Sequence, residues 1–130
     1  MNRQIEYYQN KLDFEMDPSD LLMGMKKGEG IVPLDTRKSV AYNKEHIPSA
    51  ISLPHREIDE NRTRGLDKTK TYVCYCSGNG CNASTHGALK MIKLGFKVKE
   101  LYGGLESWKS DGYATEGIHS SQEQEVKCEC

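Results

Sequence analysis

The organisation of this chain is decided at residues 71–94, which read TYVCYCSGNGCNASTHGALKMIKL. Residues 71–76 are β-branched, aromatic or apolar, and this composition predicts a buried strand. A loop of small residues follows at 77–82, and the periodicity of residues 83–94 predicts a helix whose apolar face holds Ser84, Ala88, Met91 and Ile92. A strand that leads through a short loop into a helix is typical of a parallel sheet with crossover helices.

The same alternation continues on both sides of this stretch. Short apolar runs predict strands over residues 31–35, 50–53 and 97–101. Helices are predicted over residues 3–12, from an Asp17 N-cap to near Gly28 or Gly30, and over 105–111, with a short helix inside 56–70. The predicted fold class is therefore α/β, with a small, mostly parallel twisted sheet flanked by helices on both faces.

The length of 130 residues corresponds to one domain. We expect a helical extension at 1–13, in which Ile5, Tyr8 and Leu12 form an apolar face, then the domain at 14–116 and a polar, disordered tail at 117–130. Eighteen basic and 19 acidic residues give a net charge of −1, which argues against binding of nucleic acid or of an anionic membrane surface.

No apolar run is long enough to cross a bilayer, and the first residues do not resemble a signal peptide. The expected compartment is therefore the cytoplasm, where the five cysteines should be mostly reduced thiols. Because five is an odd number, complete pairing within the chain is impossible.

Cys76 has the surroundings of a reactive thiol. It ends the predicted strand, and the loop after it contains two glycines and leads into a helix N-terminus. Inward-pointing N–H groups in such a loop, together with the helix dipole, stabilise a thiolate and bind an anion. We therefore predict Cys76 as the nucleophile and the following backbone amides as its anion site: Ser77, Gly78, Asn79, Gly80, Cys81 and Asn82. A buried structural thiol is the simpler alternative.

Four motifs in order along the chain resemble those of single-domain rhodaneses, a family of sulfurtransferases. They are Asp35-Thr36-Arg37, then His46-Ile47-Pro48-Ser49-Ala50 with Ser49 in place of the usual glycine, the loop that begins at Cys76, and Gly103-Gly104-Leu105-Glu106-Ser107-Trp108. The resemblance covers about residues 14–115.

The resemblance implies a function. Cys76 would attack the outer sulfur of a donor, hold that sulfur as a persulfide, and pass it to cyanide or to an acceptor thiol. The donor would be thiosulfate or a persulfide on a small molecule or a protein, and neither a cofactor nor a metal is implied. Asp35 and Arg37 would form a structural pair, and His46 would satisfy backbone groups in a turn.

Two features of the loop restrict its chemistry. Residues 77–85 contain no Lys or Arg, which disfavours thiosulfate, a dianion, as the physiological donor. Related phosphatases and arsenate reductases place an arginine six residues after the cysteine, where this chain has Asn82. Asparagine lacks the charge that holds an oxyanion, so these activities are disfavoured.

Several alternatives stay open on the sequence alone. Cys81 could form a disulfide with Cys76, accept its sulfur or resolve its persulfide, and the pair could serve as a thiol redox switch. The domain could also be a non-catalytic binding or regulatory module. Cys128 and Cys130 in the tail could resolve the persulfide, bind a metal or be inert. The sequence identifies neither the physiological donor and acceptor nor the oligomeric state.

Overall fold

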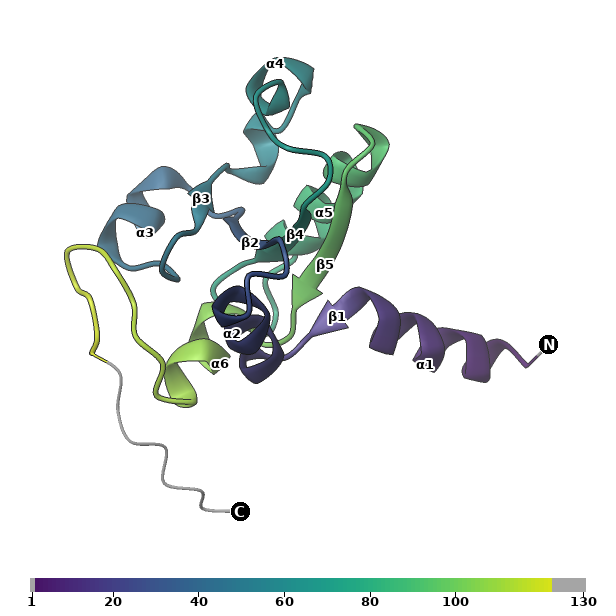
Figure 1. Ribbon diagram of the computed structural model, residues 1–130, viewed down its shortest axis with the longest axis horizontal. Helices are drawn as coiled ribbons and strands as arrows, with labels where there is room; N and C mark the ends of the chain where they lie inside the picture. The colour runs from purple at the N-terminus through teal and green to yellow at the C-terminus, as the bar shows by residue number, and fades with distance from the viewer. Residues whose placement is uncertain (1, 123–130) are drawn as a thin grey trace.

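Figure 1 shows a computed structural model of the chain, of which residues 2–122 are described. Within that range, five strands form one sheet in the order β1-β5-β4-β2-β3, and every neighbouring pair is parallel. The strands are β1 (Glu15–Met16), β2 (Ile31–Asp35), β3 (Ile51–Ser52), β4 (Thr71–Tyr75) and β5 (Lys97–Leu101). The predicted parallel α/β fold is therefore confirmed.

The helices connect these strands and cover both faces of the sheet (Figure 1). They are α1 (Arg3–Phe14), α2 (Pro18–Lys26), α3 (Ser39–Lys44), the short 3-10 helix η1 (His55–Glu57), α4 (Glu60–Thr63), α5 (Ala83–Lys93) and α6 (Gly104–Ser110). Asp17 caps α2 as predicted, because its side chain accepts a hydrogen bond from the backbone N of Asp20 at 2.8 Å.

Alternation along β4 divides the core into two clusters. Val73 and Tyr75 pack on one face of the sheet with Leu21 of α2 and Trp108 of α6. Tyr72 and Cys74 belong to the other cluster, with Leu34, Leu53, Ile58, Ala88, Met91 and Phe96. Both faces of β4 are thus buried, which explains why its sequence is apolar throughout.

Two predicted apolar faces differ from the structure. No residue of α1 is buried, and Ile5, Tyr8 and Leu12 are 53%, 60% and 80% exposed, because this helix projects away from the domain (Figure 1). In α5, Ile92 is 56% exposed although it was predicted on the buried face with Met91. Adjacent helical residues point about 100° apart, so both seldom face one sheet.

The sequence did not predict β1 or α3. The helix α3 has no buried residue and no side-chain hydrogen bond at its N-cap, so it leaves neither a periodic nor a capping signal. The predicted strand at 50–53 is reduced to β3, which pairs only with Leu34 and Asp35. At Pro33, β2 therefore has β4 as its single neighbour, which makes the missing N–H tolerable.

Residues 117–122, assigned to a disordered tail from the sequence, return to the domain by hydrogen bonds. The backbone N atoms of Ile118 and His119 donate to the carbonyls of Asn43 and Lys44, and the Ser121 N donates to Thr115 Oγ1 at 2.7 Å. The remainder of the predicted tail, with Cys128 and Cys130, lies outside the described residues. None of the helices within residues 2–122 has the length and apolar character needed to cross a membrane.

Candidate active site

Cys76 follows the last residue of β4 at the carboxyl edge of the sheet, and its side chain is 3% exposed. The start of α6 holds the backbone there: Leu105 N donates to the Cys76 carbonyl at 2.9 Å, and Glu106 N donates to the Ser77 carbonyl at 2.8 Å. Gly104 has φ of +60°, and a Cβ on it would collide with the Cys76 carbonyl oxygen. The Gly-Gly segment is therefore part of the framework of the cysteine loop.

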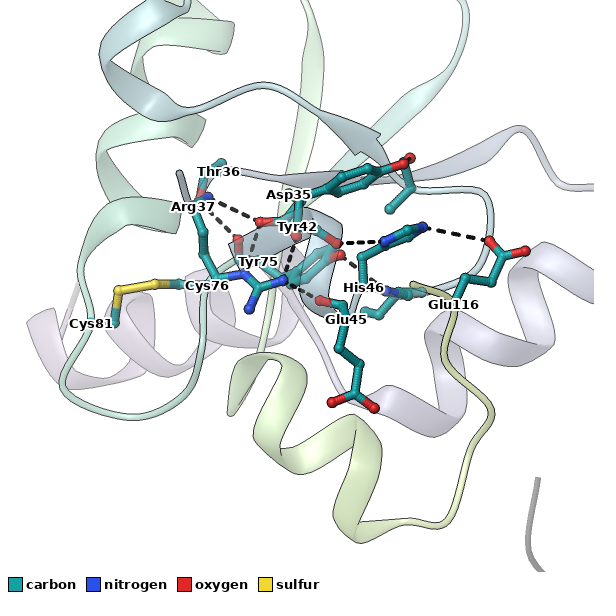
Figure 2. A network of polar contacts seen from close by, with 12 residues as sticks. Asp35, Thr36, Arg37, Tyr42, Glu45, His46, Tyr75, Cys76, Cys81 and Glu116 are labelled. Carbon is teal, nitrogen blue, oxygen red and sulfur yellow. Dashed lines mark hydrogen bonds and ion pairs between the residues drawn. A yellow bond between two sulfur atoms is a disulfide. The ribbon is translucent and has the colours of Figure 1, made fainter. Parts of the chain in front are cut away.

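The structure joins Cys76 to Cys81 in a disulfide (Figure 2). The two Cα atoms lie 6.3 Å apart, within the range that a disulfide spans without movement of the backbone. Gly80, at φ of +87°, helps the loop turn back on itself. The expectation of reduced thiols is therefore wrong for this pair in this structure, and Cys76 needs reduction before it can act as a nucleophile.

The backbone amides of the loop are available to a ligand. Within the described part of the chain, Cys81 N is the only amide of residues 77–82 with a recorded protein acceptor, the Gly78 carbonyl at 3.3 Å. The Asn82 side chain makes no capping hydrogen bond to α5. All residues of the loop except the half-buried Gly78 are exposed. The predicted anion site therefore has unpaired N–H donors beside Cys76.

Two cavities of different character flank Cys76 and Cys81. The larger, of about 650 Å³, lies between the loop, α3 and η1, and its lining includes Lys38 and Arg56, both exposed. The smaller, of about 160 Å³, is lined by the carboxylates of Glu15 and Glu100. In the lining of the first cavity, which we call the basic cavity, Arg37, Lys38 and Arg56 outnumber the single acid Glu57, so its charge favours an anion more than that of the second cavity does.

His55 also lines the basic cavity. Burial and the nearby charge of Lys90 lower the pKa of His55, so this side chain is neutral at pH 7. The His86 ring stacks on it with a centroid separation of 5.6 Å. The exposed positive charges in the lining therefore come from Lys38 and Arg56, since Arg37 is half-buried and paired with Asp35.

Sequence reasoning missed this pair because it searched for a cation only within the loop. Lys38 follows β2 and Arg56 follows β3, so both lie at the carboxyl edge that also holds Cys76. The position of both residues just after predicted strands was the available signal, since chemistry in parallel sheets gathers at that edge.

Asp35 and Arg37 form the predicted pair (Figure 2). The Asp35 carboxylate is fully buried and accepts from Arg37 Nε at 3.0 Å and from Nη2 at 2.7 Å. The same Nη2 donates to the Glu45 carbonyl at 2.6 Å. The guanidinium thus links the end of β2 to the end of α3.

His46 contacts Tyr42 and Glu116. Its Nδ1 lies 2.7 Å from the Tyr42 carbonyl, its ring stacks on that of Tyr42 at 3.8 Å between centroids, and its Nε2 lies 3.7 Å from a Glu116 carboxylate oxygen (Figure 2). These contacts are those of a residue that holds a turn, and they separate His46 from the cysteine loop.

Cys74 is fully buried, as predicted for a core residue. Burial, with a smaller effect from the charge of Glu100, raises the pKa of its thiol to about 12.

Residues 2–122 contain no group of three or more His, Cys, Asp or Glu side chains arranged to bind a metal ion.

Comparison with known proteins identifies the family. The family model "Rhodanese-like domain" matches residues 17–111, and the chain belongs to this family. Several relatives bear the name thiosulfate sulfurtransferase GlpE, among them one from Pseudomonas syringae and one from Coxiella burnetii. The one from Pseudomonas syringae is 30% identical over 100 residues, which cover 75% of this chain and 90% of the relative. The one from Coxiella burnetii is 34% identical over 85 residues, or 65% and 77% of the two chains.

Two solved structures share the fold of this chain. The BH2092 protein of Bacillus halodurans superposes with a TM-score of 0.85 at 43% identity, over 92% of this chain and 88% of that one. A full-length protein from Lactobacillus plantarum gives 0.78 at 31% identity, over 88% and 97% of the two chains.

Proposed function

We propose that this protein is a sulfurtransferase that receives sulfane sulfur on Cys76 as a persulfide and passes it to a thiophilic acceptor. The observation on which this proposal depends is the placement of Cys76 at a strand end, beside unpaired loop amides and in the lining of the basic cavity. The names of the relatives agree with it, because they describe thiosulfate sulfurtransferases.

The first step begins with the reduced chain. The Cys76 thiolate attacks the outer sulfur of the donor, a new S–S bond forms, and the old S–S bond breaks. With thiosulfate the leaving group is sulfite, and with a persulfide it is the thiolate of the donor. Lys38 and Arg56 attract either anion into the basic cavity, so the absence of a cation from residues 77–85 does not exclude thiosulfate.

The loop stabilises what the first step produces. Negative charge resides on the outer sulfur of the persulfide, and the amides of Ser77, Gly78, Asn79, Gly80 and Asn82 are the donors available to it, whereas Cys81 N donates to the Gly78 carbonyl. Oriented amides need no reorganisation as the charge moves between sulfur atoms. An acceptor, either cyanide or a thiolate, then attacks the outer sulfur and regenerates the Cys76 thiolate.

The cytoplasm is the compartment that suits this proposal. Small thiols and dithiol proteins there can reduce the Cys76–Cys81 disulfide and thus produce the active thiolate.

Intact-protein mass spectrometry tests the proposal. Reduced wild type, Cys76→Ser and Cys81→Ser proteins are exposed to thiosulfate and, separately, to a small persulfide. We expect Cys81→Ser to gain one sulfur atom that cyanide removes, and Cys76→Ser to gain none. Sulfur uptake that survives in Cys76→Ser, or no uptake by any form with either donor, would refute the assignment.

A further inference from the structure

We propose that Cys81 is a resolving thiol that turns sulfur transfer into sulfide release, an activity that rests on the proposed Cys76 persulfide. In this reaction Cys81 attacks the persulfide and expels its outer sulfur as hydrosulfide. The chain is left with the Cys76–Cys81 disulfide that the structure contains.

The loop geometry directs Cys81 to the inner sulfur of the persulfide. Five positions separate the two cysteines, and the loop brings their Sγ atoms into a direct bond while β4 and α5 keep their regular structure on either side. A thiol placed to receive the outer sulfur would have to lie one atom further from Cys76. The structure instead places Cys81 Sγ on Cys76 Sγ itself, which is the inner sulfur of the persulfide.

Cys81 is also the thiol that lies against the inner sulfur. In the disulfide form Cys76 is 3% exposed, with Cys81 Sγ bonded to its Sγ. Cys81 belongs to the exposed part of the loop and approaches from within the chain. Attack on the inner sulfur is therefore intramolecular, with a high effective concentration, whereas transfer to an external thiol needs an encounter.

The step balances in atoms and electrons. The lone pair of the Cys81 thiolate forms the new S–S bond with Cys76 Sγ. The bond between Cys76 Sγ and the outer sulfur breaks, and its electron pair leaves with that sulfur, which takes up the proton that the Cys81 thiol gave up on ionising and departs as HS⁻. The sulfane sulfur is reduced to sulfide, and the two cysteines are oxidised to the disulfide.

Another turnover needs an external reductant, for which we propose a dithiol protein or small dithiol. One of its thiolates attacks the exposed Cys81 Sγ, and the Cys76 thiolate leaves into the loop, where the amides stabilise it. Its second thiolate then attacks the mixed disulfide and frees Cys81. The reductant ends as a disulfide, and the chain regains both thiols.

A single-turnover experiment without free thiol tests this assignment. Fully reduced protein is freed of reductant under anaerobic conditions and mixed with thiosulfate, then sulfide is measured and the mass is recorded under non-reducing conditions. We expect wild type to release about one sulfide per chain and to lose two hydrogen atoms. Because Cys81→Ser keeps the loop amide and loses only the thiol, it should retain one added sulfur atom and release no sulfide until a dithiol is added.

The remaining outcomes separate this proposal from the one on which it rests. A wild-type chain that holds its persulfide and releases no sulfide would overturn the resolving role and leave the sulfurtransferase assignment intact. Sulfide release that survives in Cys81→Ser and disappears in a Cys128→Ser/Cys130→Ser variant would place the resolving thiol in the C-terminal segment. Failure of both wild type and Cys81→Ser to take up sulfur from thiosulfate or from a small persulfide would remove both proposals.

Discussion

The guanidinium of Arg37 donates to both carboxylate oxygens of Asp35, from Nε at 3.0 Å and from Nη2 at 2.7 Å (Figure 2). The backbone N of Arg37 adds a third hydrogen bond, to Asp35 Oδ1 at 3.0 Å. The carboxylate is fully buried, and Arg37 is the cation paired with it. The geometry indicates a pair that supports the loop framework.

Arg37→Ala should destabilise the protein by about 3 kcal/mol, because it leaves a buried carboxylate unpaired. Arg37→Lys should recover only part of this, since an ammonium cannot form the two parallel hydrogen bonds. Urea unfolding measures both effects. Sulfur uptake per folded chain should change little, and a tenfold fall in uptake at nearly unchanged stability would instead make Arg37 a catalytic residue.

Lys38 and Arg56 should govern the entry of an anionic donor. Replacing either with Gln should raise KM for thiosulfate roughly threefold, with kcat nearly unchanged, because an exposed charge near the route contributes less than about 1 kcal/mol. The effect should fade at high salt. Lys93→Gln is the matched control, since Lys93 lines a separate cavity beside α4. Equal effects of all three substitutions would show that the charges of this cavity have no specific role in the entry of the donor.

Gly104→Ala should perturb the cysteine loop more than a glycine substitution elsewhere. Gly104 and Gly28 both have positive φ, +60° and +66°, so alanine is strained at either position by about 1 kcal/mol. At Gly104 the new Cβ also meets the Cys76 carbonyl oxygen, whereas nothing lies within 4 Å at Gly28. We expect a further loss of about 2 kcal/mol at Gly104 in chemical unfolding, accompanied by reduced persulfide formation. Similar losses for both variants would contradict the proposed contact.

Cys74 should be unreactive in the folded, reduced protein. Its thiol has a pKa raised to about 12 by burial, so almost none is thiolate at pH 8, and it is also fully buried. Iodoacetamide followed by peptide mapping should modify Cys76 and Cys81 first and Cys74 only after unfolding in urea. Labelling of Cys74 at the rate of Cys81 would show that the core opens readily.

Glu45 should make stability depend on acid. Burial alone raises the pKa of Glu45, but hydrogen bonds from Lys109, Thr115 and Ser121 outweigh it and lower the pKa below its ordinary value of 4.5. A carboxylate with a lowered folded-state pKa stabilises the fold above the unfolded-state pKa, and this contribution is lost as pH falls through the folded-state pKa.

Glu45→Gln should therefore cost about 1 kcal/mol at pH 7, with a difference from wild type that shrinks below about pH 4. Unfolding free energies measured from pH 3 to pH 7 give this comparison. A difference that stays constant across that range would show that the charge of Glu45 is not the source of its contribution.

The sequence by itself determined the parallel α/β order and the place of Cys76. The spacing of apolar residues and the composition are local properties of the chain, so they predict strands well. The strands predicted at 31–35 and 97–101 agree with β2 and β5 in both bounds, and the strand predicted over 71–76 differs from β4 by a single residue. A cysteine directly after such a strand lies at the carboxyl edge of a parallel sheet in any arrangement of its neighbours. Family motifs added the expectation of the Asp35–Arg37 pair.

Only the tertiary structure decided what surrounds that cysteine. On the sequence alone, a disulfide between Cys76 and Cys81 was one of several possible roles for Cys81. The path of the loop that joins the two residues depends on backbone torsion angles such as the positive φ of Gly80. Lys38 and Arg56 reach one cavity because β2 and β3 end at the same edge as β4, although both residues are distant from the loop in sequence. The exposure of Ile5, Tyr8 and Leu12 likewise follows from where α1 points, since an apolar period specifies a face without specifying what covers it.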